Sequence, residues 1–126
     1  MSYDLGVWYP HQRLTNSEAG QIYVDLCESR QTSLQAHPAL RAFYDELYAA
    51  HPEIDDIPEE RIDDHEYCPW SCAHDRSDAH MIMCCVFSQA DSVHNVVHKL
   101  AREHGLAVYD PQSETITYPN GKTGAA

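Results

Sequence analysis

The sequence predicts an α+β fold, because short segments with the alternation of strands are interleaved with longer segments that have the spacing of helices. Residues 3–9 alternate in polarity, with tyrosine, leucine and valine on one side. Residues 80–87 are apolar on both sides, as in a central strand that is covered on both faces. Three further segments repeat apolar residues at spacings of three and four, which is the pattern of amphipathic helices.

Two helices are expected in the first half of the chain. The first covers residues 16–29, since Thr15 and Glu18 have the spacing of a capping box. The second begins at Pro38, a residue that suits the start of a helix, and carries the clearest apolar stripe in the sequence. It ends before residues 51–52, where a proline disfavours helix in the residue that precedes it.

The second half of the chain adds a helix and short strands. Ser88 can cap the third helix, and Gly105 is a natural stop at its end. Residues 75–78 read as a turn. Besides residues 80–87, short strands are expected at 68–73, 106–109 and 115–118.

The order of these elements is strand, helix, helix, strand, strand, helix, strand and a last short strand. This order predicts a ferredoxin-like split βαβ sandwich with an extra helix in the first crossover. The length fits a single α+β domain over residues 1–126. Within it we expect an acidic insertion at about residues 52–66 and a flexible, glycine-containing tail at about residues 119–126.

The charge of the chain is concentrated in one stretch. Twelve of the 20 acidic residues lie between Asp45 and Asp78, together with only two basic residues, in a chain of net charge −12. A surface this negative repels phosphate, so nucleic acid and anionic membranes are not expected partners. A basic protein is the partner that such a surface favours, unless the segment is a solvated loop that keeps the protein soluble.

The N-terminal residues lack a charged segment followed by an apolar one, and no stretch is apolar enough to span a membrane. We therefore expect a cytoplasmic protein. The five cysteines do not form the even, spaced set of a secreted disulfide framework, so reduced thiols are expected.

A partner-binding surface is predicted on and beside the acidic insertion. Its carboxylates would supply the charge, and two aromatic residues at its border would supply an apolar centre, the composition of an interface hot spot. The predicted binding residues are Asp55, Asp56, Glu59, Glu60, Asp63, Asp64, Glu66, Tyr67, Trp70, Asp75 and Asp78.

A zinc site is the alternative that the same region offers. Four ligand-type side chains, His65, Cys68, Cys72 and His74, lie within ten residues. Their spacing is irregular, and packed cysteines with surface histidines explain them as well. No cofactor is therefore expected, with zinc as the alternative. No glycine-rich phosphate loop or oriented nucleophile is recognisable, so no catalytic residues are predicted.

Two segments resemble a family of small, mostly uncharacterised bacterial proteins. They are Ser2-Tyr-Asp-Leu-Gly-Val-Trp8 and Glu103-His-Gly-Leu-Ala-Val-Tyr-Asp-Pro-Gln112, with Pro69-Trp70 matching a Pro-Trp in the middle of that family. The resemblance implies a compact α+β bacterial protein and, by association of context, an immunity partner of a toxin. It transfers no catalytic residue, and the cysteines and histidines around Trp70 depart from the family pattern.

These observations favour a non-enzymatic, immunity-type inhibitor that neutralises a bacterial toxin domain through protein–protein contacts on its acidic surface. Two alternatives remain open from the sequence. One is a small zinc-binding enzyme or sensor that uses the histidines and cysteines of residues 65–74. The other is a homo-oligomeric structural module, such as a homodimer that covers the apolar run of residues 81–87.

Overall fold

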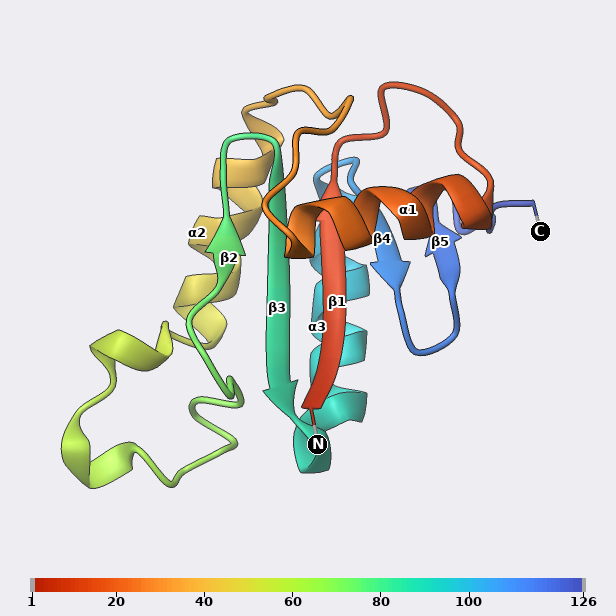
Figure 1. Cartoon of the computed structure of the whole chain (residues 1–126). Helices are drawn as coiled ribbons and strands as arrows, with labels where there is room; N and C mark the ends of the chain where they lie inside the picture. Colours follow the sequence, from red (N-terminus) through yellow and green to blue (C-terminus); the bar gives the residue numbers. More distant parts are fainter. Residues whose placement is uncertain (1, 126) are drawn as a thin grey trace.

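The computed structural model describes residues 2–125 as an α+β domain with a five-stranded antiparallel sheet and three α-helices (Figure 1). The strands are β1 (Ser2–Trp8), β2 (Asp75–Arg76), β3 (His80–Val86), β4 (Ala107–Asp110) and β5 (Thr115–Thr117). The helices are α1 (Asn16–Cys27), α2 (Ala39–Ala50) and α3 (Ala90–Glu103). Three short 3-10 turns complete the structure: η1 (Ile54–Asp56), η2 (Glu59–Arg61) and η3 (Phe87–Gln89).

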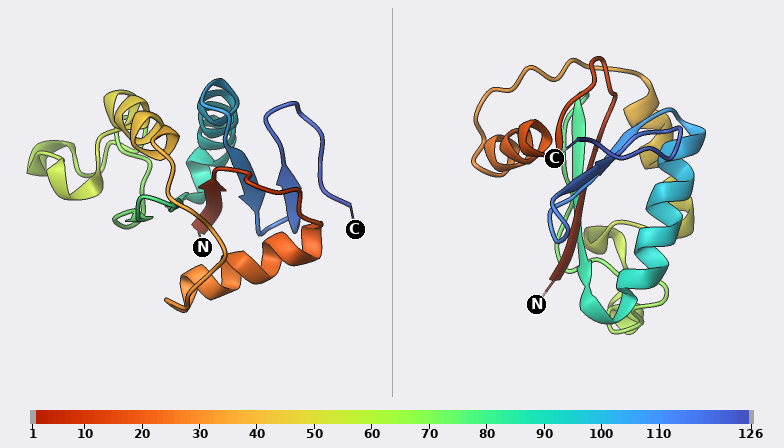
Figure 2. Two further views of the ribbon diagram at one scale, coloured as in Figure 1. Left: turned by 90° about the horizontal axis from the view of Figure 1, so that it is seen from above. Right: turned by 90° about the vertical axis from the view of Figure 1, so that its right-hand side faces the viewer.

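The strands lie in the order β2-β3-β1-β4-β5, so that β1 and β3 occupy the middle of the sheet. Helices α2 and α3 pack on one face and α1 packs on the other (Figure 2). Side chains of β1 point alternately to the two faces of the sheet. Leu5 and Val7 join the core under α2 and α3, whereas Trp8 joins the core under α1. The segment between β1 and β2 thus carries two helices, α1 on one face of the sheet and α2 on the other.

The local signals at the start of α1 are confirmed. The Thr15 hydroxyl accepts a hydrogen bond from the Glu18 backbone N–H at 3.1 Å, and the Glu18 carboxylate accepts one from the Thr15 N–H at 2.9 Å. This reciprocal capping box satisfies two backbone donors that the first turn of a helix leaves free. In α2, Pro38 precedes the first helical residue, and Leu40, Phe43 and Leu47 are buried along one stripe.

The strand expected at residues 68–73 is wrong. The turn expected at residues 75–78 is wrong for Asp75–Arg76, which form β2, and the chain turns at residues 77–79 instead. Residues 68–73 carry a single isolated bridge, between Trp70 and Cys85, and the regular pairing with β3 is made by Asp75–Arg76. The register changes between these two points, so the chain bulges away from the sheet. The strand propensities of the residues could not locate this bulge, because the position of the bulge depends on where the loop meets β3.

The tail that we expected to be flexible is hydrogen-bonded over residues 119–125. The Gly124 N–H donates to the Ile116 carbonyl at 2.9 Å, and the Asn16 N–H donates to the Ala125 carbonyl at 2.7 Å. A β-carbon at Gly124 would lie 2.7 Å from Ile116 and 2.8 Å from the Asn16 side chain, so only glycine allows this close approach. The tail therefore closes the end of the sheet against the start of α1.

None of the helices described in the structure is long and apolar enough to cross a membrane.

Candidate binding surface on the acidic insertion

The acidic insertion, residues 52–66, leaves the end of α2 and projects beyond the β2 edge of the sheet (Figure 1). Pro58 separates η1 from η2, so the segment forms two short turns instead of a continuous helix, as its proline predicts. Ile54 and Ile57 are half-buried and pack against the main core. The insertion is therefore fixed to the domain by apolar contacts.

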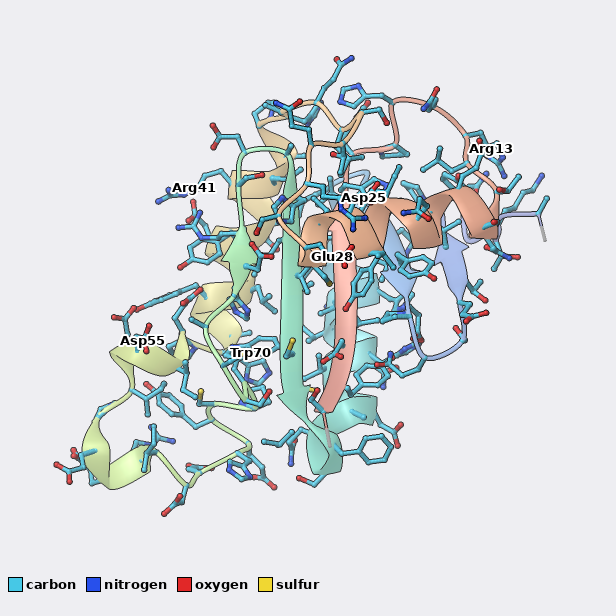
Figure 3. All side chains as sticks on the ribbon, viewed as in Figure 1. Arg13, Asp25, Glu28, Arg41, Asp55 and Trp70 are labelled. Carbon is cyan, nitrogen blue, oxygen red and sulfur yellow. The ribbon has the colours of Figure 1, made fainter. Side chains whose placement is uncertain are left out.

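The predicted carboxylates of the insertion are all exposed, and Figure 3 labels Asp55 at its outer side. Two of them also shape the loop. Asp56 accepts a hydrogen bond from the Tyr48 hydroxyl at 2.9 Å. Asp64 accepts one from Arg61 at 3.0 Å and one from the Tyr67 backbone N–H at 3.3 Å. The Arg61 hydrogen bond, followed by that from Tyr67, holds the pKa of Asp64 below its ordinary value.

The remaining five predicted carboxylates make no side-chain hydrogen bond or ion pair with any residue of the described chain. They are Asp55, Glu59, Glu60, Asp63 and Glu66. Arg61, the single base within the insertion, is already engaged: it pairs with Asp64 and lies 3.5 Å above the centre of the Tyr67 ring. The outward charge of the insertion is thus left without an internal counter-charge.

Trp70 is not an exposed anchor, which corrects the prediction from the sequence. Its side chain is 2% exposed, belongs to the main core and donates its indole N–H to the His51 carbonyl at 3.2 Å. Figure 3 shows it lying inward of the insertion. Tyr67 is half-buried and covered by Arg61, so it reaches the surface only in part.

The apolar side chains that do reach the surface here are Ile62, 43% exposed, and Tyr48, 36% exposed. Sequence reasoning missed both. Tyr48 shares the stripe of α2 with core residues, and Ile62, like the two isoleucines that are packed inward, is a single apolar residue beside an aspartate. One signal in the sequence could have predicted the exposure of Ile62: it follows Pro58, the residue that separates the two turns of the insertion.

Two predicted binding residues lie elsewhere. Asp75 and Asp78 are exposed, but they belong to β2 and the turn after it. Asp75 lies 3.4 Å from a ring nitrogen of His80, and the Asp78 carbonyl accepts from the His37 N–H at 3.1 Å, next to the start of α2. The insertion follows the other end of this helix, so Asp78 is not part of the same surface.

The four candidate zinc ligands do not converge. His65 and Cys72 are exposed, whereas Cys68 is buried and lies 3.8 Å from the Pro52 carbonyl. Within residues 2–125 no three side chains of histidine, cysteine, aspartate or glutamate are placed to hold a metal ion. His74 is buried instead against the Trp70 ring, and burial, together with the nearby Arg76 charge, lowers its pKa to about 4.

The comparisons with known proteins found no family model, curated protein or solved structure that matches this chain.

Proposed function

We propose that the protein is an immunity-type inhibitor of the bacterial cytoplasm, which binds the basic surface of a cognate toxin domain through the acidic insertion. The observation that carries the proposal is the anchored loop on which seven exposed carboxylates surround a single, internally paired base. A surface of this kind attracts a basic protein over distances of about one Debye length, about 8 Å at physiological salt. Binding alone suffices for inhibition, so the proposal requires no catalytic group.

The centre of this surface is proposed to be Ile62 with Tyr48. Charge accelerates the encounter between two proteins, but the lifetime of the complex depends on desolvated apolar contacts. Ile62 is exposed directly before Asp63 and Asp64, and Tyr48 donates its hydroxyl to Asp56. These two side chains therefore take the place of Trp70 as the apolar centre of recognition.

We further propose a ferredoxin-like sandwich as the scaffold. The order β2-β3-β1-β4 and the shared face of α2 and α3 support this assignment. In this description α1 is an addition on the opposite face, and β5 extends the sheet beside β4.

The test uses the toxin candidate encoded beside the protein's own gene. The variant Glu59→Gln/Glu60→Gln/Asp63→Asn removes three charges and spares Asp56 and Asp64, which hold the loop. We expect its association rate with the toxin domain, measured by surface plasmon resonance at low salt, to fall about tenfold. The dependence of that rate on salt should become shallower, because fewer charges steer the encounter.

The matched control is Asp91→Asn/Glu103→Gln/Glu114→Gln, which removes the same residue types from exposed positions outside the insertion. It should bind the toxin domain and protect cells that express it as the original protein does. The proposal fails if both triple variants behave alike, or if the original protein neither binds the neighbouring gene product nor protects against it.

A further inference from the structure

A cavity of about 320 Å³ lies at the opposite end of α2 from the acidic insertion. It opens between the first turn of α2 and the hairpin that joins β2 to β3. Leu40, Tyr44 and Met81 form apolar walls, while the polar lining comes mainly from basic and hydroxyl side chains. The cavity shares none of the exposed carboxylates of the insertion.

Two arginines meet at this cavity, although the whole chain has only eight lysines and arginines. The guanidinium carbon of Arg76 lies 3.8 Å from the centre of the Tyr44 ring, and that of Arg41 lies 5.9 Å from the same centre. Figure 3 shows Arg41 on the outer side of α2. Arg76 forms no ion pair with a carboxylate of residues 2–125, so its charge is not neutralised by direct contact.

Besides the arginines, His37 offers a donor at the cavity. The Nδ1 atom of His37 accepts a hydrogen bond from the Ala39 N–H at 3.0 Å, which leaves the proton of the neutral ring on Nε2. The His37 ring is fixed by stacking on Tyr9, with ring centres 3.7 Å apart. The Ser77 hydroxyl accepts from the Ala79 N–H at 3.0 Å. It donates its one proton to Nδ1 of His80 at 2.8 Å, because Nε2 of that ring faces Asp75, so Ser77 has no free donor.

Carboxylates around the cavity reduce its positive charge. Asp45 binds Arg41 at 2.9 Å, Asp75 lies beside His80, and Asp78 is among the lining residues. Burial raises the pKa of Glu53 and the charge of Arg76 opposes that rise, so Glu53 also interacts with the field of this arginine. An anion can bind to the guanidinium of Arg76, which forms no direct ion pair within the described residues, and to the terminal nitrogens of Arg41, because Asp45 contacts only Nε.

We propose that this cavity binds a small oxyanion, a phosphate or carboxylate group, through Arg76 and Arg41, with His37 as a further donor. Guanidinium groups match the planar geometry of such oxygens and form charge-assisted hydrogen bonds. The first turn of α2 adds a favourable dipole, since it holds no acidic residue that would offset the dipole. This site is independent of the proposed contact with a toxin domain.

The test is a titration of the full ¹⁵N-labelled chain at constant ionic strength, followed by NMR, with inorganic phosphate in one arm and citrate in the other. A site with a Kd of about 1 mM is nearly saturated at about 20 mM ligand. We expect saturable shifts at the amides of His37, Arg41, Ser77 and His80. Saturation by citrate alone would identify a carboxylate site, and saturation by phosphate alone a phosphate site.

Arg76→Gln should weaken binding about tenfold, since it removes a charge-assisted contact. The matched control, Arg30→Gln, removes the same charge from an arginine that pairs with Asp25 and Glu28 outside the cavity, and should leave the affinity unchanged. Asp78→Asn should tighten binding by removing a repulsive carboxylate. The inference is overturned if neither anion gives saturable shifts, if both arginine variants lose affinity equally, or if Asp78→Asn weakens binding.

Discussion

Replacing Trp70 by phenylalanine should lower the stability of the domain by about 2–3 kcal/mol. The indole is 2% exposed, packs edge-on against His74 with ring centres 4.4 Å apart and donates its N–H to the His51 carbonyl. Losing a buried hydrogen bond costs about 1 kcal/mol or more when its partner is left unsatisfied. The smaller ring leaves a cavity, which adds about 1–2 kcal/mol, less than the about 3–5 kcal/mol expected for Trp70→Ala.

Urea denaturation followed by far-ultraviolet circular dichroism measures this difference. The slope of the unfolding free energy against urea concentration should be the same for both proteins. Tyr67→Phe is the control, because the Tyr67 ring is half-buried and its hydroxyl forms no hydrogen bond within the described chain; we expect a change below about 0.5 kcal/mol. Toxin affinity should be the same for the folded Trp70→Phe variant and the original protein. Unchanged stability with lost binding would refute the reasoning and restore Trp70 as an anchor.

Two other predictions concern buried polar groups. Tyr118→Phe should cost about 2 kcal/mol in the same assay, because the Tyr118 hydroxyl bonds both the N–H and the carbonyl of Leu14; a loss below about 0.5 kcal/mol would contradict this role. The folded-state pKa of His74, about 4, lies below its ordinary value of 6.5, so the unfolded chain binds this proton first as pH falls. His74 therefore contributes a loss of stability between about pH 7 and pH 4, and the pH dependence of unfolding should differ in His74→Gln by this contribution; identical profiles would contradict it.

The order and type of the main elements could be predicted because each leaves a local signal. The capping box at Thr15, the stripe of α2 and the alternation of β1 all operate within a few residues. The Tyr-Asp-Pro-Gln segment of the C-terminal half has a structural role: the side chain of Gln112 accepts from the Asp4 N–H and donates to the Asp4 carbonyl, both at 2.8 Å. This contact ties β1 to the segment that follows β4.

What could not be predicted depends on contacts between distant segments. Trp70 follows the acidic insertion closely in sequence, but its bridge to Cys85 and its bond to His51 bury it. The hydrogen bonds of the tail depend on the approach of Gly124 to Ile116, which composition does not reveal. Likewise, Arg41 and Arg76 are separated by most of the acidic stretch and meet only because the β2–β3 hairpin lies beside α2.

The three isoleucines of the insertion argue for recognition over a loop that merely stays hydrated. Ile54 and Ile57 pack on the core, which restrains the carboxylates that follow them, and ordering a loop costs conformational entropy. Like charges held together repel one another, and Arg61 offsets only part of this repulsion through Asp64. A loop needed only for solubility gains nothing from such restraint, nor from exposing Ile62 among its charges. The basic partner that we propose would relieve the repulsion and cover Ile62, so both unfavourable features would become contributions to binding.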